Sequence, residues 1–109
     1  MTVSDFVKKC EFDIQCVPCP DKEISGVYIG DLLSWVMGKA SQGNLWLTIM
    51  TNVNVVAVAS LTDVSAIVLT EGVVLDSDVL SVAESKGINV LTTKLSSYDA
   101  ALKISGITQ

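Results

Sequence analysis

The chain has 109 residues, of which half are apolar and only 17% are charged, and its formal net charge is −5. This length suits one domain, and an acidic balance with lysine as the sole basic residue argues against nucleic-acid binding, which needs clustered basic side chains. The chain has no histidine, which excludes Ser–His and Cys–His catalysis and histidine metal sites. The apolar surplus predicts a sheet buried on both faces and an interface with another subunit.

The first twenty residues are less typical than the rest of the chain. A short helix is predicted over Ser4–Cys10, with Ser4 as its cap. Glu11–Cys16 alternates apolar and polar residues, which is typical of a half-exposed strand. Its apolar positions are Phe12, Ile14 and Cys16. The start of the chain lacks a basic stretch followed by an apolar core, so we expect no secretory signal.

A regular pattern follows, in which strand-like runs alternate with helical stretches. The runs begin about twenty residues apart, which suits successive strand–helix units, near Val27, Leu45, Ala66 and Ile88. Small polar residues are predicted to cap the helices, namely Asp31, Asn52, Asp76 and Ser96 or Ser97. Glycines are predicted to end three of them, namely Gly43, Gly87 and Gly106.

The two central runs decide the predicted fold class. Leu45–Met50 and Ala66–Leu69 are almost continuously apolar, as parallel strands buried on both faces are. The Val-rich segment Val53–Ala59 is predicted to be a helix, because parallel strands need a crossover between them. We therefore expect a single α/β domain over residues 1–109, with a mainly parallel sheet of four to five strands flanked by helices in a three-layer, Rossmann-like arrangement. Polar residues interrupt the apolar region, so we expect no membrane span and a cytoplasmic protein.

Three cysteines, an odd number, fit a reducing compartment better than a disulfide scaffold. Cys16 and Cys19 form a CxxC pair, and Cys10 is a third weak candidate for a metal ligand. A structural metal or cluster takes four ligands, and Pro20 disfavours the helix that a redox CxxC begins. The alternative is a turn whose cysteines pack as small apolar groups. We therefore predict no metal and no cofactor.

Polar turns after the predicted strands are the candidate ligand site. In an open parallel sheet, ligands bind outside the carboxyl ends of the strands, where helix amides and threonine hydroxyls could hold a small anion. The alternative is that these residues only cap helices. The candidate residues are Gly30, Asp31, Thr51, Asn52, Thr70, Glu71, Thr92, Thr93 and Lys94. An enzyme acting through Asp31, Glu71 and Lys94 is a third, weaker hypothesis, because these residues have no spacing signature.

The helix predicted after Asp31 is apolar over most of its circumference, which indicates cover on more than one side. That second cover is either another subunit, or the N-terminal helix or a loop of the same chain. We predict a homodimer, with Trp35 and Met37 at its interface.

Three segments resemble the DRTGG domain, over about Asp21–Ile104. They are DKEISGVYIGDLLSWVMGKA, TIMTNVNVVAVASL and GINVLTTKLSSYDAA. The letters that name the family fall on Asp21, Lys22, Ser25, Gly26 and Val27, of which the aspartate and one glycine match. Val27 stands where the family pattern has a glycine. Its side chain argues against a close approach of the backbone to a ligand at this position.

The resemblance implies an α/β module that accompanies catalytic parts in phosphate acetyltransferases, CBS-containing pyrophosphatases and relatives of HPr kinase. It implies a non-catalytic regulatory or dimerisation role, which we extend to binding of a small anionic metabolite or nucleotide. Stand-alone members of the family are associated with iron–sulfur hydrogenases and redox signalling. The alternative function is therefore an accessory subunit of such a system.

Overall fold

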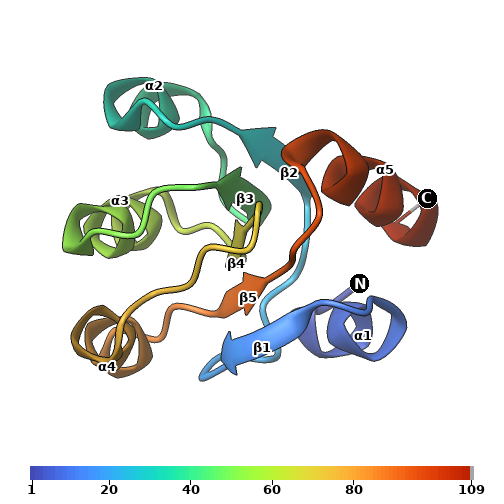
Figure 1. Cartoon of the computed structure of the whole chain (residues 1–109), viewed down its shortest axis with the longest axis horizontal. Coiled ribbons are helices and arrows are strands. Elements are labelled where there is room, and N and C mark those ends of the chain that lie inside the picture. Colours follow the sequence, from blue (N-terminus) through green and yellow to red (C-terminus); the bar gives the residue numbers. More distant parts are fainter. Residues whose placement is uncertain (109) are drawn as a thin grey trace.

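A computed structural model describes residues 1–108, which form one five-stranded sheet between two layers of helices (Figure 1). The strands are β1 Asp13–Cys16, β2 Gly26–Ile29, β3 Asn44–Thr48, β4 Ala66–Leu69 and β5 Val90–Thr92. They lie in the order β1-β5-β4-β3-β2. Strands β2 to β5 are parallel, and β1 pairs with β5 in the antiparallel sense. The predicted mainly parallel, three-layer α/β fold is confirmed.

Five helices cover the two faces of the sheet. They are α1 Val3–Lys9, α2 Leu33–Lys39, α3 Val53–Thr62, α4 Ser77–Ser85 and α5 Ser97–Thr108. Each step from β2 to β5 moves to the next strand in the same direction. Such steps place the intervening helices α2, α3 and α4 on one face, whereas α1 and α5 cover the other (Figure 1). None of the helices in residues 1–108 is long and apolar enough to span a membrane.

The sheet has a separate hydrophobic core on each face, because side chains alternate along every strand. Trp46, Ile67 and Val90 are paired across β3, β4 and β5 and pack toward α2, α3 and α4. Leu45 and Ala66, also a pair, pack toward α1 and α5. Burying one large apolar side chain stabilises the fold by about 1.5–3 kcal/mol. Both central strands are therefore apolar at every buried position except Thr48, the last residue of β3.

The N-terminal segment differs from the prediction in two respects. Thr2, not Ser4, caps α1: its Oγ1 accepts from Asp5 N at 3.1 Å, and the Asp5 carboxylate accepts from Thr2 N at 3.2 Å. In β1, the register shifts between Ile14 and Cys16. This bulge ends the predicted alternation, so Phe12 and Cys16 lie in the cores of opposite faces. Ile14 is 55% exposed, so the three apolar positions of the predicted half-exposed strand do not share one buried side.

Three of the predicted caps are confirmed and one is wrong. The side chains of Asn52, Asp76 and Ser96 each accept a hydrogen bond from a backbone N–H two or three residues later. Asp31 caps nothing: α2 begins after Leu32, which makes no side-chain capping bond. The Asp31 carboxylate instead bonds to the end of β3.

The glycine stops were also right in part. Gly87, with φ of +73°, follows the last residues of α4 as predicted. Helix α2 ends at Lys39, before Gly43. Helix α5 continues through Gly106 to Thr108, because Ile104 and Ile107 on either side of the glycine pack into the core and keep the helix against the sheet.

Candidate functional site

The nine candidate ligand residues lie where β2, β3, β4 and β5 end, along the carboxyl edge of the parallel part of the sheet. The chain leaves β4 toward α4 on one face and leaves β5 toward α5 on the other (Figure 1). This divergence between neighbouring strands is the place where open α/β sheets bind ligands.

At the β2 and β3 ends, the polar groups hold the two turns together. Asp31 Oδ1 accepts from Thr48 Oγ1 at 2.8 Å and from Ile49 N at 3.1 Å. The Gly30 carbonyl accepts from Trp46 Nε1 at 2.9 Å, which satisfies the buried indole. Gly30 and Asp31 thus fix the end of β2 onto β3. Asn52, the cap of α3, is exposed at the next turn along this edge.

At the β4 and β5 ends, the two loops bond directly to each other. Glu71 N donates to Leu95 O at 2.8 Å, and Gly72 N donates to Thr93 O at 3.0 Å. Glu71 and Gly72 both have positive φ, of 62° and 79°, as in a tight two-residue turn. Thr70 is fully buried and shares a 2.8 Å hydrogen bond with Ser97 Oγ. The amides of this turn therefore donate to protein carbonyls and not to an anion.

Three of the candidates, Thr92, Thr93 and Lys94, line a pocket of about 260 Å³ beside β5, here called the β5 pocket, whereas Thr51 does not. Its lining residues are Glu11, Phe12, Asp13, Thr92, Thr93, Lys94, Leu95 and Lys103. The Lys103 ammonium lies 3.0 Å from Glu11 Oε2, and Lys94 is exposed. The pocket thus presents two ammonium groups and two threonines beside two carboxylates. Lys103, on α5, is a member that sequence analysis missed.

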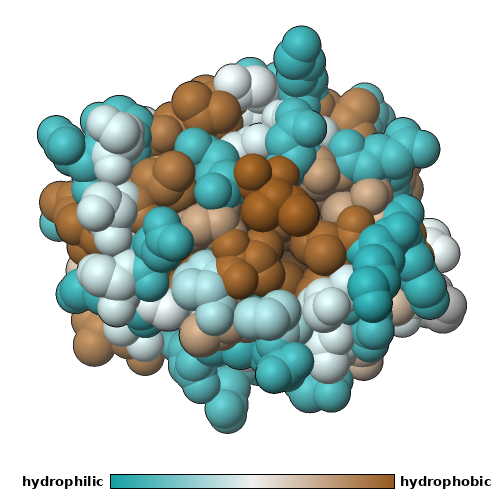
Figure 2. Space-filling view, turned by 90° about the horizontal axis from the view of Figure 1, so that it is seen from below, coloured by the Kyte–Doolittle hydropathy of each residue, from teal (hydrophilic) through white to brown (hydrophobic). Residues whose placement is uncertain are grey.

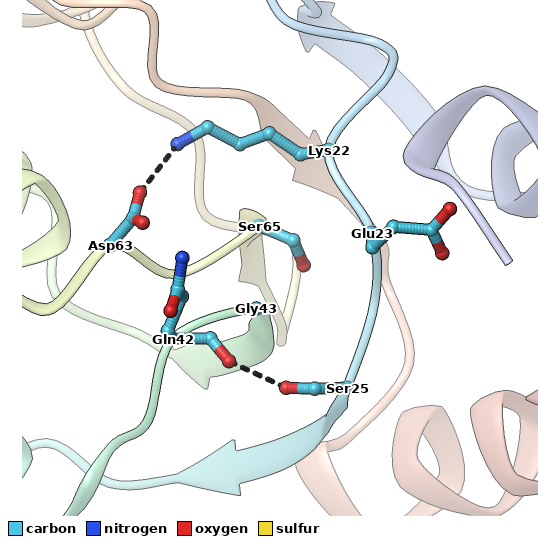
Figure 3. Close-up of a pocket in the computed structure, with 7 residues that line it drawn as sticks. All are labelled: Lys22, Glu23, Ser25, Gln42, Gly43, Asp63 and Ser65. Atoms are coloured by element: carbon cyan, nitrogen blue, oxygen red, sulfur yellow. Dashed lines mark hydrogen bonds and ion pairs between the residues drawn. The ribbon is translucent and has the colours of Figure 1, made fainter.

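A larger pocket, of about 410 Å³, lies at the opposite edge of the sheet and is here called the amino-edge pocket (Figure 3). Its lining residues are Lys22, Glu23, Ser25, Gln42, Gly43, Asp63 and Ser65, from the segments that lead into β2, β3 and β4. Lys22 Nζ lies 3.2 Å from Asp63 Oδ1 across the pocket. Ser25 Oγ donates to Gln42 O at 2.6 Å. None of these residues was predicted from the sequence to form a ligand site.

Two unusual backbone positions shape the amino-edge pocket. Gly43 has φ of +85°, and a Cβ there would lie 2.8 Å from Ser25 Oγ and 2.9 Å from Glu23 O. A side chain at this position would push the two walls apart. Asp63 ends α3 in the left-handed region, with φ of +56°, and so aims its carboxylate at Lys22. The sequence signal for this turn was Gly43, which we predicted only as a helix stop.

A comparison with protein families shows the family of this chain. The family model of the DRTGG domain matches residues 29–107. The chain belongs to the DRTGG domain family. The resemblance found in the sequence is thus confirmed, although the match begins after the residues 21–27 on which we placed the naming letters. A search of curated proteins finds no significant match.

This DRTGG domain is also similar in structure to part of a pyrophosphatase. The crystal structure of the CBS and DRTGG domains of the regulatory region of Clostridium perfringens pyrophosphatase, complexed with its activator diadenosine tetraphosphate, matches with a TM-score of 0.75. The two chains are 17% identical, and the match covers 97% of this chain. It covers 46% of the pyrophosphatase chain, so this chain spans less than half of that length. The likeness shows a shared fold.

The cysteines of this DRTGG domain lie apart in the fold. Cys10 and Cys16 are buried in the cores of opposite faces. Burial raises the pKa of both thiols above the ordinary range. Cys19 is partly exposed, and Asn89 holds its backbone. Within residues 1–108, no three His, Cys, Asp or Glu side chains gather in a group that could hold a metal ion.

Both edges of the sheet carry exposed apolar surface. On α2, beyond the β2 edge, Trp35 is 59% exposed and Met37 45%, whereas Val36 is fully buried. Lys39 Nζ lies 5.3 Å from the centroid of the Trp35 ring. At the other edge, Figure 2 shows apolar surface at the centre of the face over β1, where Ile14 is exposed.

Proposed function

We propose that this DRTGG domain is a non-catalytic regulatory module that binds a small anionic metabolite or nucleotide and forms a homodimer. We further propose that residues 1–109 constitute this one domain, of which residues 1–20 are a less typical N-terminal addition. The observation that carries the ligand proposal is the meeting of Lys94, Lys103 and two threonines around the β5 pocket, at the carboxyl end of β5 and beside the start of β1.

The chemistry of the β5 pocket supports an anionic ligand with more than one charge. Lys94 is exposed and available, whereas Lys103 is paired with Glu11 at 3.0 Å. An ion pair with an 85% exposed carboxylate is worth at most about 1 kcal/mol. A phosphate group with two charges can therefore displace Glu11, and threonine hydroxyls can donate to its other oxygens.

The comparison supports the same class of ligand. The regulatory region of the pyrophosphatase is complexed with a nucleotide activator. The comparison supports a regulatory role. It does not support the alternative function, an accessory subunit of an iron–sulfur hydrogenase or redox system. The absence of histidine from the chain supports a non-catalytic role.

The test is calorimetric titration with ATP, ADP and inorganic pyrophosphate. We expect at least one to bind with a Kd below about 1 mM, and Lys94→Ala and Lys103→Ala each to weaken binding about tenfold, since a charged hydrogen bond contributes about 1.5–3 kcal/mol. Lys86→Ala, an exposed lysine outside the pocket, is the matched control. The proposal fails when none of the three probes binds, or when both variants bind as the unaltered protein does.

The homodimer is supported by the exposed apolar side chains of α2. Trp35 and Met37 lie on its surface, and exposed tryptophans of this kind are enriched among residues that dominate interface energies. Light scattering at micromolar concentration should detect the dimer. Trp35→Ala should weaken its association about thirtyfold or more, the effect of losing roughly 2 kcal/mol. Tyr98→Ala, also aromatic and 70% exposed but on α5, should leave it unchanged. A monomer in every sample, or an unaltered dimer in Trp35→Ala, would contradict this assignment.

A further inference from the structure

The amino-edge pocket has the chemistry of a second binding site, independent of the function proposed above. We propose that it binds a free α-amino acid in its zwitterionic form. Lys22 contacts the carboxylate of the ligand and Asp63 contacts its ammonium group.

The size and walls of the pocket suit a small polar molecule. Its volume of about 410 Å³ is within the usual range of ligand pockets, roughly 300–1,000 Å³. Three chain segments that are distant in sequence meet around it: the approach to β2, the turn before β3 and the turn between α3 and β4 (Figure 3). Backbone bonds fix these walls, since Gly43 N donates to Asp63 O at 2.9 Å and Ser25 N donates to Gly43 O at 2.9 Å.

The opposite charges of the pocket lie side by side and reach solvent. Lys22 Nζ is 3.2 Å from Asp63 Oδ1, and the two side chains are 29% and 53% exposed. An ammonium group has three donors and a carboxylate can accept several hydrogen bonds. Lys22 Nζ also donates to Val64 O at 3.5 Å, so the ammonium group retains one donor, and the Asp63 carboxylate retains free acceptor capacity. An α-amino acid carries the complementary pair, a carboxylate and an ammonium group on one carbon, so it can bond to both at once.

The charge balance disfavours the simpler ions. Lys22 is the one ammonium group among the lining residues, and a phosphate beside it would also meet the like charge of Asp63. A monovalent cation would compete with Lys22 for Asp63. Glu23 points away from the pocket (Figure 3), and its Oε2 lies 3.1 Å from the N-terminal ammonium. The pocket thus offers one positive and one negative group.

Neutral groups beside the charged pair can contact the side chain of the ligand. Figure 3 shows the Gln42 amide on the same wall as Asp63, and an amide can both donate and accept. Ser65 is fully buried and donates to Asn44 O at 3.1 Å, so it forms part of the pocket wall and is not offered to the ligand. Ser25 Oγ is already occupied, because it donates to Gln42 O and accepts from Asn44 Nδ2. We therefore expect polar amino acids to bind more tightly than aliphatic ones.

The test is a thermal-shift screen against the common free amino acids, followed by calorimetry with the best binder. Two further probes are its amine without the carboxylate and its acid without the ammonium group. The variants are Lys22→Met, which removes the charge and keeps the apolar stem, and Asp63→Asn, which removes the charge and tolerates the left-handed backbone. Lys86→Met is the control.

We expect an amino acid to bind, each charge variant to weaken it roughly ten- to hundredfold, and both single-charge probes to bind correspondingly less well. Lys86→Met should bind as the unaltered protein does. The proposal is overturned if no amino acid binds up to about 10 mM, if both pocket variants keep full affinity, or if a single-charge probe binds as tightly as the zwitterion. Titration of ATP, ADP and pyrophosphate into Lys22→Met separates the two sites, since the β5 pocket is intact there.

Discussion

Replacement of Asn89 by alanine should be among the most destabilising single changes in this domain. Asn89 is fully buried immediately before β5. Its Oδ1 accepts from Cys19 N at 2.9 Å, and its Nδ2 donates to Cys19 O at 2.8 Å and to Ser65 O at 2.9 Å. One side chain thus joins β5, the turn that leads to Lys22, and the start of β4.

The magnitude follows from these three bonds. A buried hydrogen bond contributes about 1 kcal/mol, and an unsatisfied buried partner costs about 1–3 kcal/mol. Asn89→Ala removes three bonds and leaves an N–H and two carbonyl groups of Cys19 and Ser65 without this partner. We expect a loss of about 3–4 kcal/mol, a large share of the roughly 5–15 kcal/mol by which such domains are stable.

Urea unfolding measures this loss. With a slope of about 1.5–2 kcal/mol per molar urea, the midpoint should fall by roughly 2 M. Asn54→Ala makes the same chemical change at an exposed position on α3 and should shift the midpoint little or upward, since alanine favours a helix. Equal midpoints for Asn89→Ala and the unaltered protein would show that this network does not hold the three segments together.

Further predictions concern a glycine and the buried thiols. Gly43→Ala should lower the free energy of unfolding by about 1–3 kcal/mol, because residue 43 has a positive φ and its new Cβ would contact Glu23 O. Gly38→Ala in α2, where a Cβ meets nothing, should raise the free energy of unfolding by up to about 1 kcal/mol, and thermal unfolding of the two variants measures both changes. Burial raises the pKa of Cys10 and Cys16, so their contribution to stability is complete below the unfolded thiol pKa and is lost as the pH rises through the folded pKa. Urea midpoints should therefore fall above about pH 9, and less so when both cysteines are alanine.

Features set by local or repetitive interactions could be predicted from the sequence. Asn52 and Asp76 bond to amides two and three residues away, so their caps depend on nothing distant. The central strands are apolar on both faces because helices cover both faces of the sheet. This burial is visible in the sequence as an almost unbroken run of apolar residues. The helix predicted over Val53–Ala59 lies within α3, and it was predicted from the connection that a parallel sheet requires, against the strand preference of valine.

Features that depend on distant partners could not be predicted in this way. Asp31 has the residue type and position of a cap, but Thr48 Oγ1 and Ile49 N, 17 and 18 residues later, compete successfully for its carboxylate. The bulge in β1 reflects how that strand meets β5, and alternation alone assumes a regular register. In both cases the deciding partner becomes adjacent only after the sheet has formed.

Of the β5 pocket and the amino-edge pocket, only the first contains residues that were predicted from the sequence. The rule that ligands bind at carboxyl ends pointed to Thr92, Thr93 and Lys94, which do line the β5 pocket. The walls of the amino-edge pocket come from residues 22–25, 42–43 and 63–65, which no spacing rule connects. They meet because the parallel register sets Gly26 beside Asn44 and Leu45 beside Ala66, so the turns that precede these strands converge on one edge. Predicting the register as well as the strands would bring the turn that carries Lys22 beside the turn that carries Asp63. The two residues would then be recognised from the sequence as a pair of opposite charges, and the two variants described above test its function.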